Sequence, residues 1–297
     1  MKTITMQALM ELIRSDKPKN VILDTDTFNE ADDQFCLAYC MRSTDKINLL
    51  SVNAAPFFNS NSTSAADGME KSYREIFKVI KLTDPNADYP VYRGSTDFLK
   101  NKTIPMESDA ANNIINTVMN SQEPVIIVAI GAITNVASAL IKCPQLAERT
   151  AVIWLGGHAL HYPHSKEFNM RQDVLASQVV FDSGIPLIHV PCAGVCTEFI
   201  TTVAELEAYI DQKNELCSYL VENVRKEASY ASSRIIWDVT AAAVLTVPSA
   251  FEIVQIPRPM VTAESNYAFD SARPHYGYVR RLKRDVIYGD LFRKLAK

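Results

Sequence analysis

The sequence predicts an α/β fold with an open, mostly parallel sheet flanked by helices. Short apolar runs alternate with amphipathic stretches along most of the 297 residues, which is the element order of parallel strands joined by helices. Hydrophobic residues make up 47% and charged residues 22% of the chain, as is usual for a globular protein with a full core. No repeat, low-complexity tract or Pro/Gly-rich linker divides the sequence. A single domain is therefore predicted over residues 1–297.

Local patterning predicts the elements of the first half of the chain. Apolar residues recur at helical spacing in the helices, whereas the strands are short apolar runs. In chain order these elements are a helix at 4–15, a strand at 20–24, a helix at 32–41, a strand at 47–55, a helix at 69–81, a strand at 90–92 and a helix at 108–120. The strand at 20–24 ends in acidic residues, so a buried strand is expected to meet a loop there.

The second half continues the alternation. In chain order its elements are a strand at 124–130, a helix at 134–142, a strand at 151–155, a helix at 173–182, a strand at 186–190, a mostly helical stretch at 203–247, strands at 251–255 and 276–281, and a helix at 290–297. The strand at 124–130 is the most strongly apolar of them. Gly184 is expected to end the helix before it, because glycine favours the left-handed conformation of helix ends.

Charge and glycine spacing exclude several classes of partner. The net charge is −4, which does not favour a nucleic acid or an anionic membrane. The nine glycines, at 68, 94, 131, 156, 157, 184, 194, 277 and 289, form no G-x-G-x-x-G, and none precedes a lysine. The dinucleotide-binding fingerprint and the common nucleoside-triphosphate loop are therefore absent.

The cysteines and apolar runs predict a cytoplasmic protein. The six cysteines, at 36, 40, 143, 192, 196 and 217, form no C-x-x-C pair and are expected to be reduced core residues. Charged residues interrupt the first twenty positions, so no secretory leader is expected. The longest apolar stretches, such as 125–133, are much shorter than the roughly 18 residues of a membrane span.

The most informative segment is 23–34, Leu-Asp-Thr-Asp-Thr-Phe-Asn-Glu-Ala-Asp-Asp-Gln. Its acids follow a predicted buried strand, and open α/β sheets bind ligands at the carboxyl ends of their strands. Carboxylates this close repel one another unless a cation compensates, and oxygen ligands favour Ca²⁺ or Mg²⁺. Acids at a helix start also complement the helix dipole. That explanation covers Glu30, Asp32 and Asp33 but not Asp24 and Asp26, so a metal site is the better interpretation.

The same segment partly matches another enzyme class. Haloacid-dehalogenase-type phosphotransferases also open with an apolar strand and D-x-D, followed at the next alternate position by Thr or Val. Phe28 stands at that position here, and in that class the paired Asp usually comes much later. A Mg²⁺-dependent phosphohydrolase with Asp24 as its nucleophile is therefore an alternative.

Several later segments, taken together, resemble one family. The segments are Ile-Gly-Ala-Ile-Thr-Asn-Val-Ala at 130–137, Trp-Leu-Gly-Gly at 154–157, Glu-Phe-Asn at 167–169 with Asp173, Val-Phe-Asp-Ser-Gly-Ile-Pro at 180–186, Trp-Asp at 237–238, and Arg-Asp with Gly-Asp-Leu-Phe at 284–292. They are similar to G-x-L-T-N-x-A, an apolar-Gly-Gly strand end, E-F-N-x-x-x-D…F-x-S-G-I-P and the last segments of the nucleoside hydrolases (ribonucleoside N-ribohydrolases). Because they keep the family's order, the resemblance covers nearly the whole chain.

The resemblance implies a fold, an activity and a cofactor. The fold is a Rossmann-like α/β sheet without the glycine fingerprint. The activity is hydrolysis of the N-glycosidic bond of a ribonucleoside to free base and ribose, in purine or pyrimidine salvage. The cofactor is one Ca²⁺ at the pocket floor, held by the carboxylates of Asp26, Asp33 and Asp238 and by the backbone carbonyl of Thr134. A homodimer or homotetramer is expected.

The resemblance also implies the sugar-binding residues. Asp32, Glu167 and Asn169 would hydrogen-bond the ribose hydroxyls. Asp26 would also be the general base, and Asp24 would support the ligands of the ion. These residue types suit the chemistry, because cleavage builds positive charge on the sugar ring. Nearby carboxylates stabilise that charge, and the attacking water needs a base.

One departure from the family pattern lengthens a loop beside the sugar. The family usually has four residues from the second Asp to the Asp pair, whereas Asp26 and Asp32 are six apart. Asn29 or Glu30 is therefore expected to enter the pocket. Asn59 follows the second strand and is the candidate for the family's asparagine near the catalytic water.

Two further departures concern the leaving base. His161 occupies the position of a family asparagine, in a loop that also holds His158 and His164. At least one of these histidines is expected to contact substrate, with His158 a substrate-binding candidate and His161 a candidate acid. Trp237 replaces the histidine that protonates the base in many members. A stacked tryptophan eases protonation of a purine, so purine nucleosides are favoured. A catalytically inactive protein that binds nucleosides or ribose is the non-enzymatic alternative.

Overall fold

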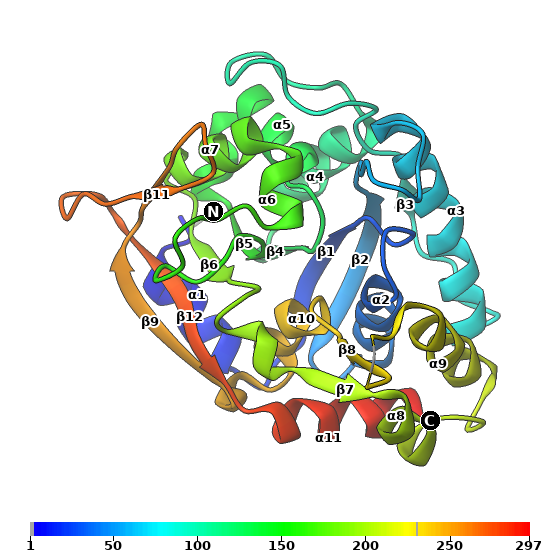
Figure 1. The fold of residues 1–297 in the computed structure, drawn as a ribbon. Coiled ribbons are helices and arrows are strands. Elements are labelled where there is room, and N and C mark those ends of the chain that lie inside the picture. Colours follow the sequence, from blue (N-terminus) through cyan, green and yellow to red (C-terminus); the bar gives the residue numbers. More distant parts are fainter. Residues whose placement is uncertain (1–2, 230) are drawn as a thin grey trace.

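The computed structural model describes residues 3–229 and 231–297. Its centre is an eight-stranded sheet in the order β3-β2-β1-β4-β5-β6-β12-β9 (Figure 1). Neighbouring strands are parallel from β3 to β12, and β9 is antiparallel to β12. The strands are β1 (Lys19–Thr25), β2 (Ile47–Ala54), β3 (Val91–Tyr92), β4 (Val125–Ala129), β5 (Thr150–Leu155), β6 (Leu187–Val190), β9 (Phe251–Pro257) and β12 (His275–Leu282). The predicted open, mostly parallel sheet is confirmed.

Helices cover both faces of this sheet. They are α1 (Met6–Arg14), α2 (Asp32–Arg42), α3 (Ala65–Thr83), α4 (Asp109–Asn120), α5 (Thr134–Lys142), α6 (Phe168–Gln172), α7 (Val174–Asp182), α8 (Val203–Tyr209), α9 (Glu215–Glu227), α10 (Val239–Thr246) and α11 (Arg284–Leu295), with 3-10 turns at Pro144–Glu148, Cys196–Glu198 and Pro248–Ala250. Side chains of α1, α2, α3, α10 and α11 form one core, and those of α4, α5 and α7 form another. Because successive strand side chains point to opposite faces, Val21 and Leu23 enter the first core and Ile22 the second.

Two short ribbons lie outside the sheet. β7 (Ile200–Thr202) pairs with β8 (Ser233–Ile235), and β10 (Met260–Val261) pairs with β11 (Tyr267–Ala268). In Figure 1, β7 and β8 cross the front of the molecule near α10. β8 leads directly into the segment that carries Trp237 and Asp238. The ribbon therefore positions Trp237 and Asp238, which come late in the chain, near the edge of the sheet where β1 ends.

Three differences from the predicted elements have a clear physical cause or concern the site. α3 begins at Ala65 rather than 69, because Ser64 Oγ accepts a hydrogen bond from the backbone N–H of Asp67 and caps the helix. β8 interrupts the stretch 203–247, which was predicted as mostly helical. α11 begins at Arg284 rather than 290, with a polar first turn that apolar periodicity does not reveal.

The expectations for cysteines and glycine are borne out. The six cysteines are unpaired, and all are buried except the half-buried Cys143. Gly184 has a φ of 79° immediately after the end of α7, where side chains are disfavoured. In the part of the chain that the structure describes, no helix is both long and apolar enough to cross a lipid bilayer.

Parallel strands bring distant parts of the sequence to one edge. Asp24 on β1 is in register with Asn53 on β2 and with Ala129 on β4. Leu155 on β5 is in register with Val190 on β6. The loops that follow these strands therefore begin at one edge of the sheet, which is where ligands bind in open α/β sheets.

Candidate active site

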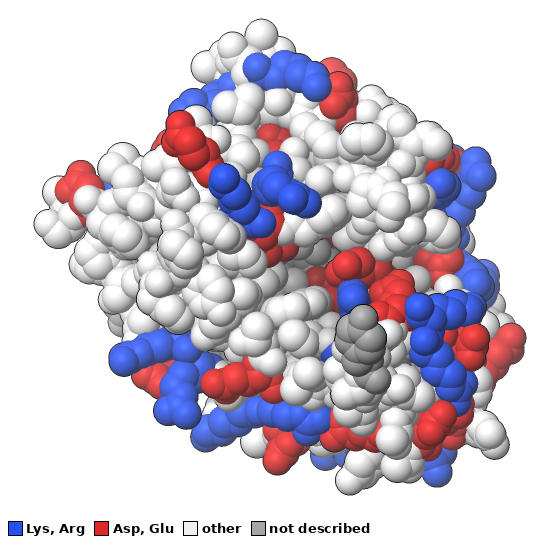
Figure 2. Space-filling view, viewed as in Figure 1, with Lys and Arg blue, Asp and Glu red and all other residues white. Residues whose placement is uncertain are grey.

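A cavity of about 330 Å³ opens at this edge. Figure 2 shows a hollow on this face, with acidic groups inside it and basic side chains beside its rim. The lining comes from the loops after β1, β4, β5, β6 and β8, and consists of Asn29, Glu30, Asp32, Asp33, Ile130, Leu155, His158, Lys166, Glu167, Phe168, Asn169, Cys192, Ala193, Trp237 and Asp238. The volume suits a small organic molecule, and the mixture of apolar walls and a few polar groups is typical of such sites.

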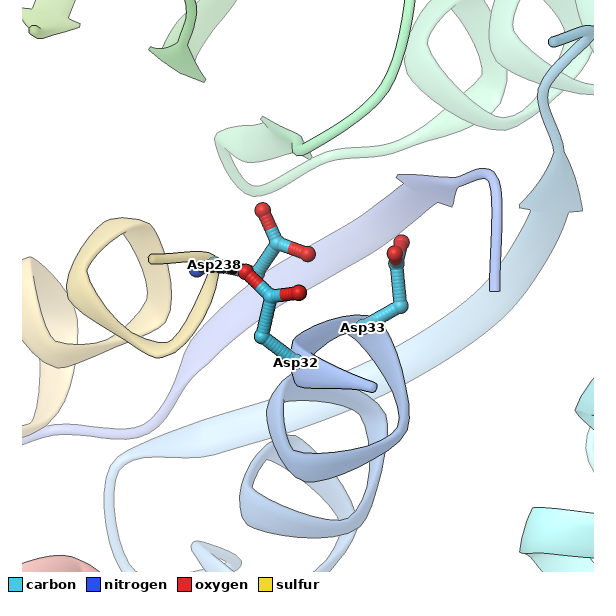
Figure 3. A group of neighbouring side chains, drawn as sticks. All are labelled: Asp32, Asp33 and Asp238. Atoms are coloured by element: carbon cyan, nitrogen blue, oxygen red, sulfur yellow. Dashed lines mark hydrogen bonds between the residues drawn. The ribbon is translucent and has the colours of Figure 1, made fainter. Parts of the chain in front are cut away.

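Three carboxylates meet at the cavity floor (Figure 3). Asp32 and Asp33 stand in the first turn of α2, and Asp238 comes from the start of α10. One oxygen of each lies within 4.8 Å of the others. The backbone N–H of Asp238 also donates to Asp32 Oδ2 at 3.4 Å. All three side chains are buried, so their charges are poorly screened by water.

Burial and mutual repulsion raise the pKa values of these acids. The pKa of Asp32 and of Asp238 lies well above the ordinary range, mainly because of burial and then because of neighbouring carboxylates. The pKa of Asp26 is raised in the same way, with Asp33 as its main charged neighbour. Burial raises the pKa of Asp33 to about 7, although Thr25 Oγ1 donates a 2.7 Å hydrogen bond to it. A bound positive charge would lower the pKa values of all four carboxyl groups and stabilise their ionised forms.

The unpaired oxygens of the cluster fit a hard cation. One oxygen of Asp24, both of Asp26 and one of Asp32 are buried without a hydrogen-bond partner, which is uncommon for buried acceptors. Carboxylate oxygens are ligands of Ca²⁺ and Mg²⁺ rather than of softer metals. Among the described residues, no other group of three acids, histidines or cysteines comes close enough to hold an ion.

Asp26 and Gly131 are packed against each other behind this floor. A Cβ built on Gly131 would lie 2.6 Å from Asp26 Oδ1, so only glycine leaves room for the carboxylate. Asp26 is not among the cavity-lining residues, and both of its carboxylate oxygens are buried. The predicted ligands Asp33 and Asp238 line the cavity, whereas Asp26 approaches the cluster from the β1 side.

Two further predicted residues also lie behind the floor. Thr134 is buried at the start of α5, and its hydroxyl donates to Asp173. Asp24 is held by the side chain of Asn135, whose Nδ2 donates to Asp24 Oδ2 at 3.0 Å. Burial raises the pKa of Asp24 to about 7. Neither residue lines the cavity, so Asp24 can act on the site only through its neighbours.

Glu167 and Asn169 also line the cavity. Glu167 caps α6, and its carboxylate accepts from the backbone N–H groups of Gly157, Asn169 and Met170 at 2.7–3.0 Å. Asn169 Nδ2 donates to the carbonyls of Ile130 and Leu155. These bonds fix both side chains and leave Asn169 Oδ1 without a donor among the described residues. Gly157 is required here, because its φ of 71° disfavours a side chain.

The histidine loop contributes His158 rather than His161 to the cavity wall. His158 is half-buried, and its Nδ1 accepts from the backbone N–H of Ala193 at 3.4 Å. Burial lowers the pKa of His158, and nearby His164 lowers it further. His161 is exposed and outside the lining, beside Tyr162. Trp237 is partly buried and lines the cavity beside Asp238, as predicted.

The loop after Asp26 enters the cavity, as its extra length predicts. Asn29 and Glu30 both line the cavity, whereas Asn59 lies behind Asn29 and donates a hydrogen bond to it. Glu30 is held by Arg234 of β8, with 2.8 Å between Arg234 Nη2 and Glu30 Oε2. The same nitrogen lies 3.7 Å from Asp32 Oδ1.

Comparison with known proteins shows the family to which this chain belongs. A family model described as inosine-uridine preferring nucleoside hydrolase matches residues 21–281, which is most of the chain. The chain belongs to this nucleoside hydrolase family. The matched range contains every residue named above for the cavity and the acid cluster, so the resemblance found in the separate motifs is confirmed as family membership.

Individual nucleoside hydrolases match parts of the chain. The pyrimidine-specific ribonucleoside hydrolase RihA of Escherichia coli is 28% identical over 172 residues, covering 48% of this chain and 55% of the relative. The non-specific ribonucleoside hydrolase RihC of Escherichia coli is 30% identical over 166 residues, covering 53% of each. The chain thus spans about half the length of the curated relatives it matches.

Solved nucleoside hydrolase structures share the fold over almost the full length. A purine-preferring ribonucleoside hydrolase from Gardnerella vaginalis has a TM-score of 0.77 at 17% identity, covering 94% of this chain and 98% of that one. An inosine-uridine preferring nucleoside hydrolase from Bacillus anthracis has a TM-score of 0.74 at 16% identity, covering 94% and 99%. At these identities the likeness establishes the architecture.

Sequence reasoning missed several residues that line the cavity or contact its lining. Cys192 and Ala193 follow β6, and the rule that ligands bind beyond strand ends could have found them. Lys166 immediately precedes the matched Glu-Phe-Asn segment. Arg234 lies in β8, a three-residue strand without a periodic signal, and nothing in the sequence links it to Glu30.

Proposed function

We propose that this protein hydrolyses the N-glycosidic bond of ribonucleosides, with Ca²⁺ as its cofactor and a preference for purine nucleosides. The observation that carries the proposal is the cluster of Asp32, Asp33 and Asp238 on the floor of a cavity, in a chain of the nucleoside hydrolase family. The cavity presents carboxylates where a sugar needs hydrogen-bond acceptors. Its apolar wall offers a surface for a base.

The cation is proposed to be held by Asp33 and Asp238 at the floor and by Asp26 from behind. Thr134 would add its backbone carbonyl. All of these proposed metal ligands are oxygen atoms, which supports Ca²⁺ over softer metals. When bound, the ion would offset the carboxylate charges and polarise the oxygens of water and sugar beside it. Asp24, which accepts a hydrogen bond from Asn135, is proposed to support the ligands of the ion.

The sugar is proposed to bind beside Asp32, Glu167 and Asn169, which all line the cavity. Asp32 Oδ1 accepts no hydrogen bond, although Arg234 Nη2 lies 3.7 Å away, and it is proposed to accept from a ribose hydroxyl. The fixed carboxylates also surround the ring carbon that becomes positive as the bond to the base breaks. A preorganised negative site lowers the energy of that transition state because the groups need not reorganise.

Two residues are proposed to handle the leaving base. Trp237 offers an aromatic face at the cavity wall, and stacking there would make a purine easier to protonate. His158 accepts at Nδ1 from Ala193, which leaves Nε2 to carry the ring proton. His158 is therefore better placed than exposed His161 to donate to the base. Asp26 is proposed as the general base for the attacking water, although its oxygens are buried in this structure.

The phosphohydrolase alternative has less support. A nucleophile must touch its substrate, and Asp24 is buried outside the lining with Asn135 bonded to it. The single-domain organisation over residues 1–297, the homodimer or homotetramer, the salvage role and the cytoplasmic location remain predictions.

A panel of ribonucleosides tests the proposed function. Inosine, guanosine, adenosine, uridine and cytidine would each be incubated with the protein, and free base and free ribose would be measured by chromatography. A phosphomonoester in a parallel reaction reports phosphate release. We expect equal amounts of base and ribose, faster release from purine nucleosides, and no phosphate. Phosphate release without base release would refute the proposal, and tight riboside binding without turnover would favour the inactive binding protein.

A further inference from the structure

We infer that Asn29 is a substrate-binding residue that donates a hydrogen bond from its side-chain amide to a ribose hydroxyl, and that Asn59 is the positioning residue that turns this amide toward the sugar. The inference rests on the proposed function and deepens it. Asn29 lies in the loop that is longer than the family pattern.

The position of Asn29 is fixed from three directions. Its backbone N–H donates to the carbonyl of Asp26 at 2.6 Å, which closes a tight turn after β1. Its backbone carbonyl accepts from Asn61 Nδ2 at 2.9 Å. Its side-chain Oδ1 accepts from Asn59 Nδ2 at 2.6 Å. Asn29 is only 5% exposed and lines the cavity, so the side chain is held rather than free to rotate.

The backbone N–H of Asn61 determines which side-chain atom of Asn29 faces Asn59 and which faces away from it. The N–H of Asn61 donates to the Asn59 side chain at 2.8 Å, and a backbone N–H can only donate. The Asn59 atom that receives it must therefore be Oδ1, and the Asn59 atom that faces Asn29 must be Nδ2. Asn29 must then present Oδ1 to Asn59. Its own Nδ2 has no acceptor among the described residues.

A donor at this place complements the carboxylates of the cavity. A sugar hydroxyl donates one hydrogen bond and accepts others. Asp32 also lines the cavity and stands three residues from Asn29 along the chain. Its Oδ1 accepts no hydrogen bond, although Arg234 Nη2 lies 3.7 Å away. A secondary hydroxyl that donates a hydrogen bond to Asp32 still has lone pairs that can accept one from Asn29 Nδ2. Together the two residues would recognise a hydroxyl by both of its hydrogen-bonding functions.

The test measures sugar binding apart from turnover. Calcium-saturated protein would be titrated with methyl β-D-ribofuranoside and with its 2-deoxy and 3-deoxy analogues, and binding would be followed by calorimetry and by tryptophan fluorescence. We expect Asn29→Ala to weaken binding of the riboside about 3- to 10-fold, the range of one ordinary hydrogen bond. Binding of the analogue that lacks the recognised hydroxyl should be unchanged by the substitution.

Asn59 variants test the positioning role. In Asn59→Asp, the new carboxylate can only accept, so Asn29 would turn its Nδ2 toward it and present Oδ1 to the sugar. We expect this variant to lose about as much riboside affinity as Asn29→Ala, although position 59 does not line the cavity. The double variant should be no worse than either single one. Ser60→Ala, at an exposed position in the same loop, is the matched control, and unchanged melting temperatures would confirm intact folds.

The outcomes separate the inference from the proposed function. If the wild-type protein binds the riboside and releases base but Asn29→Ala does so equally well, the inference is wrong and the function stands. If Asn29→Ala weakens the binding of the riboside and of both deoxy analogues equally, Asn29 does not hydrogen-bond either of these hydroxyls. The inference is then also wrong. A wild-type protein that neither binds the riboside nor releases base would overturn both.

Discussion

The cation-free protein should lose stability as the pH rises from about 4 to about 7, and Asp33 provides the magnitude. Burial raises the pKa of Asp33 to about 7 from an ordinary 3.8. In that pH range the folded protein keeps a proton that the unfolded chain releases, so a rising pH favours the unfolded chain. A shift of about three pKa units, at 1.36 kcal/mol each, corresponds to a loss of up to about 4 kcal/mol. Stability is therefore highest below about pH 4 for this group and falls as the pH approaches 7.

The assay compares urea unfolding at about pH 4.5 and about pH 7.5. The proteins are wild type, Asp33→Asn and the control Asp88→Asn, an exposed position away from the cavity, each in chelator and in excess Ca²⁺. We expect the wild type in chelator to lose more free energy of unfolding between the two pH values than Asp33→Asn. Calcium should remove that loss in the wild type only. Equal pH dependence of wild type and Asp33→Asn in chelator would refute the reasoning that burial raises the pKa of Asp33.

Four substitutions test the proposed roles in catalysis. Asp26→Ala should lower base release about 10²–10⁴-fold, the usual contribution of a general base, with the circular dichroism spectrum unchanged; near-wild-type turnover would remove Asp26 from that role. Trp237→Ala should reduce kcat/KM for inosine more than for uridine, and equal losses on the two substrates would make Trp237 structural. His158→Gln should slow base release more than His161→Gln, because only His158 lines the cavity; the reverse order, measured with purine nucleosides, would return the acid role to His161.

The sheet and the acid cluster were predictable because their signals are local. The strands are dense apolar runs between polar loops, and Asp24 to Asp33 lie within ten residues of each other. The partnership of Asp32 and Asp33 with Asp238 depends on topology. The family resemblance predicts that Asp33 and Asp238 bind one ion and that Asp32 binds the sugar beside it. The structure brings these three carboxylates together. Short elements such as β8 were not predictable, since three residues hold too little periodic signal.

The differences inside the site have physical causes that the sequence does not show. His158 rather than His161 reaches the cavity because a backbone N–H of the loop after β6 bonds to it. Asn59 lies behind Asn29 because the longer loop after β1 fills the space at the cavity wall. Both outcomes depend on contacts between loops that follow different strands. Spacing along one segment cannot reveal such contacts.

The most direct test of the central claim is the dependence of inosine hydrolysis on calcium at the carboxylate cluster. Wild-type protein and Asp238→Asn would be stripped with chelator, and hypoxanthine release would be followed as Ca²⁺ is added back. The account predicts that the stripped wild type releases no base, recovers fully with Ca²⁺, and that Asp238→Asn recovers little. Full activity in the stripped wild-type protein, or equal recovery in Asp238→Asn, would contradict the account.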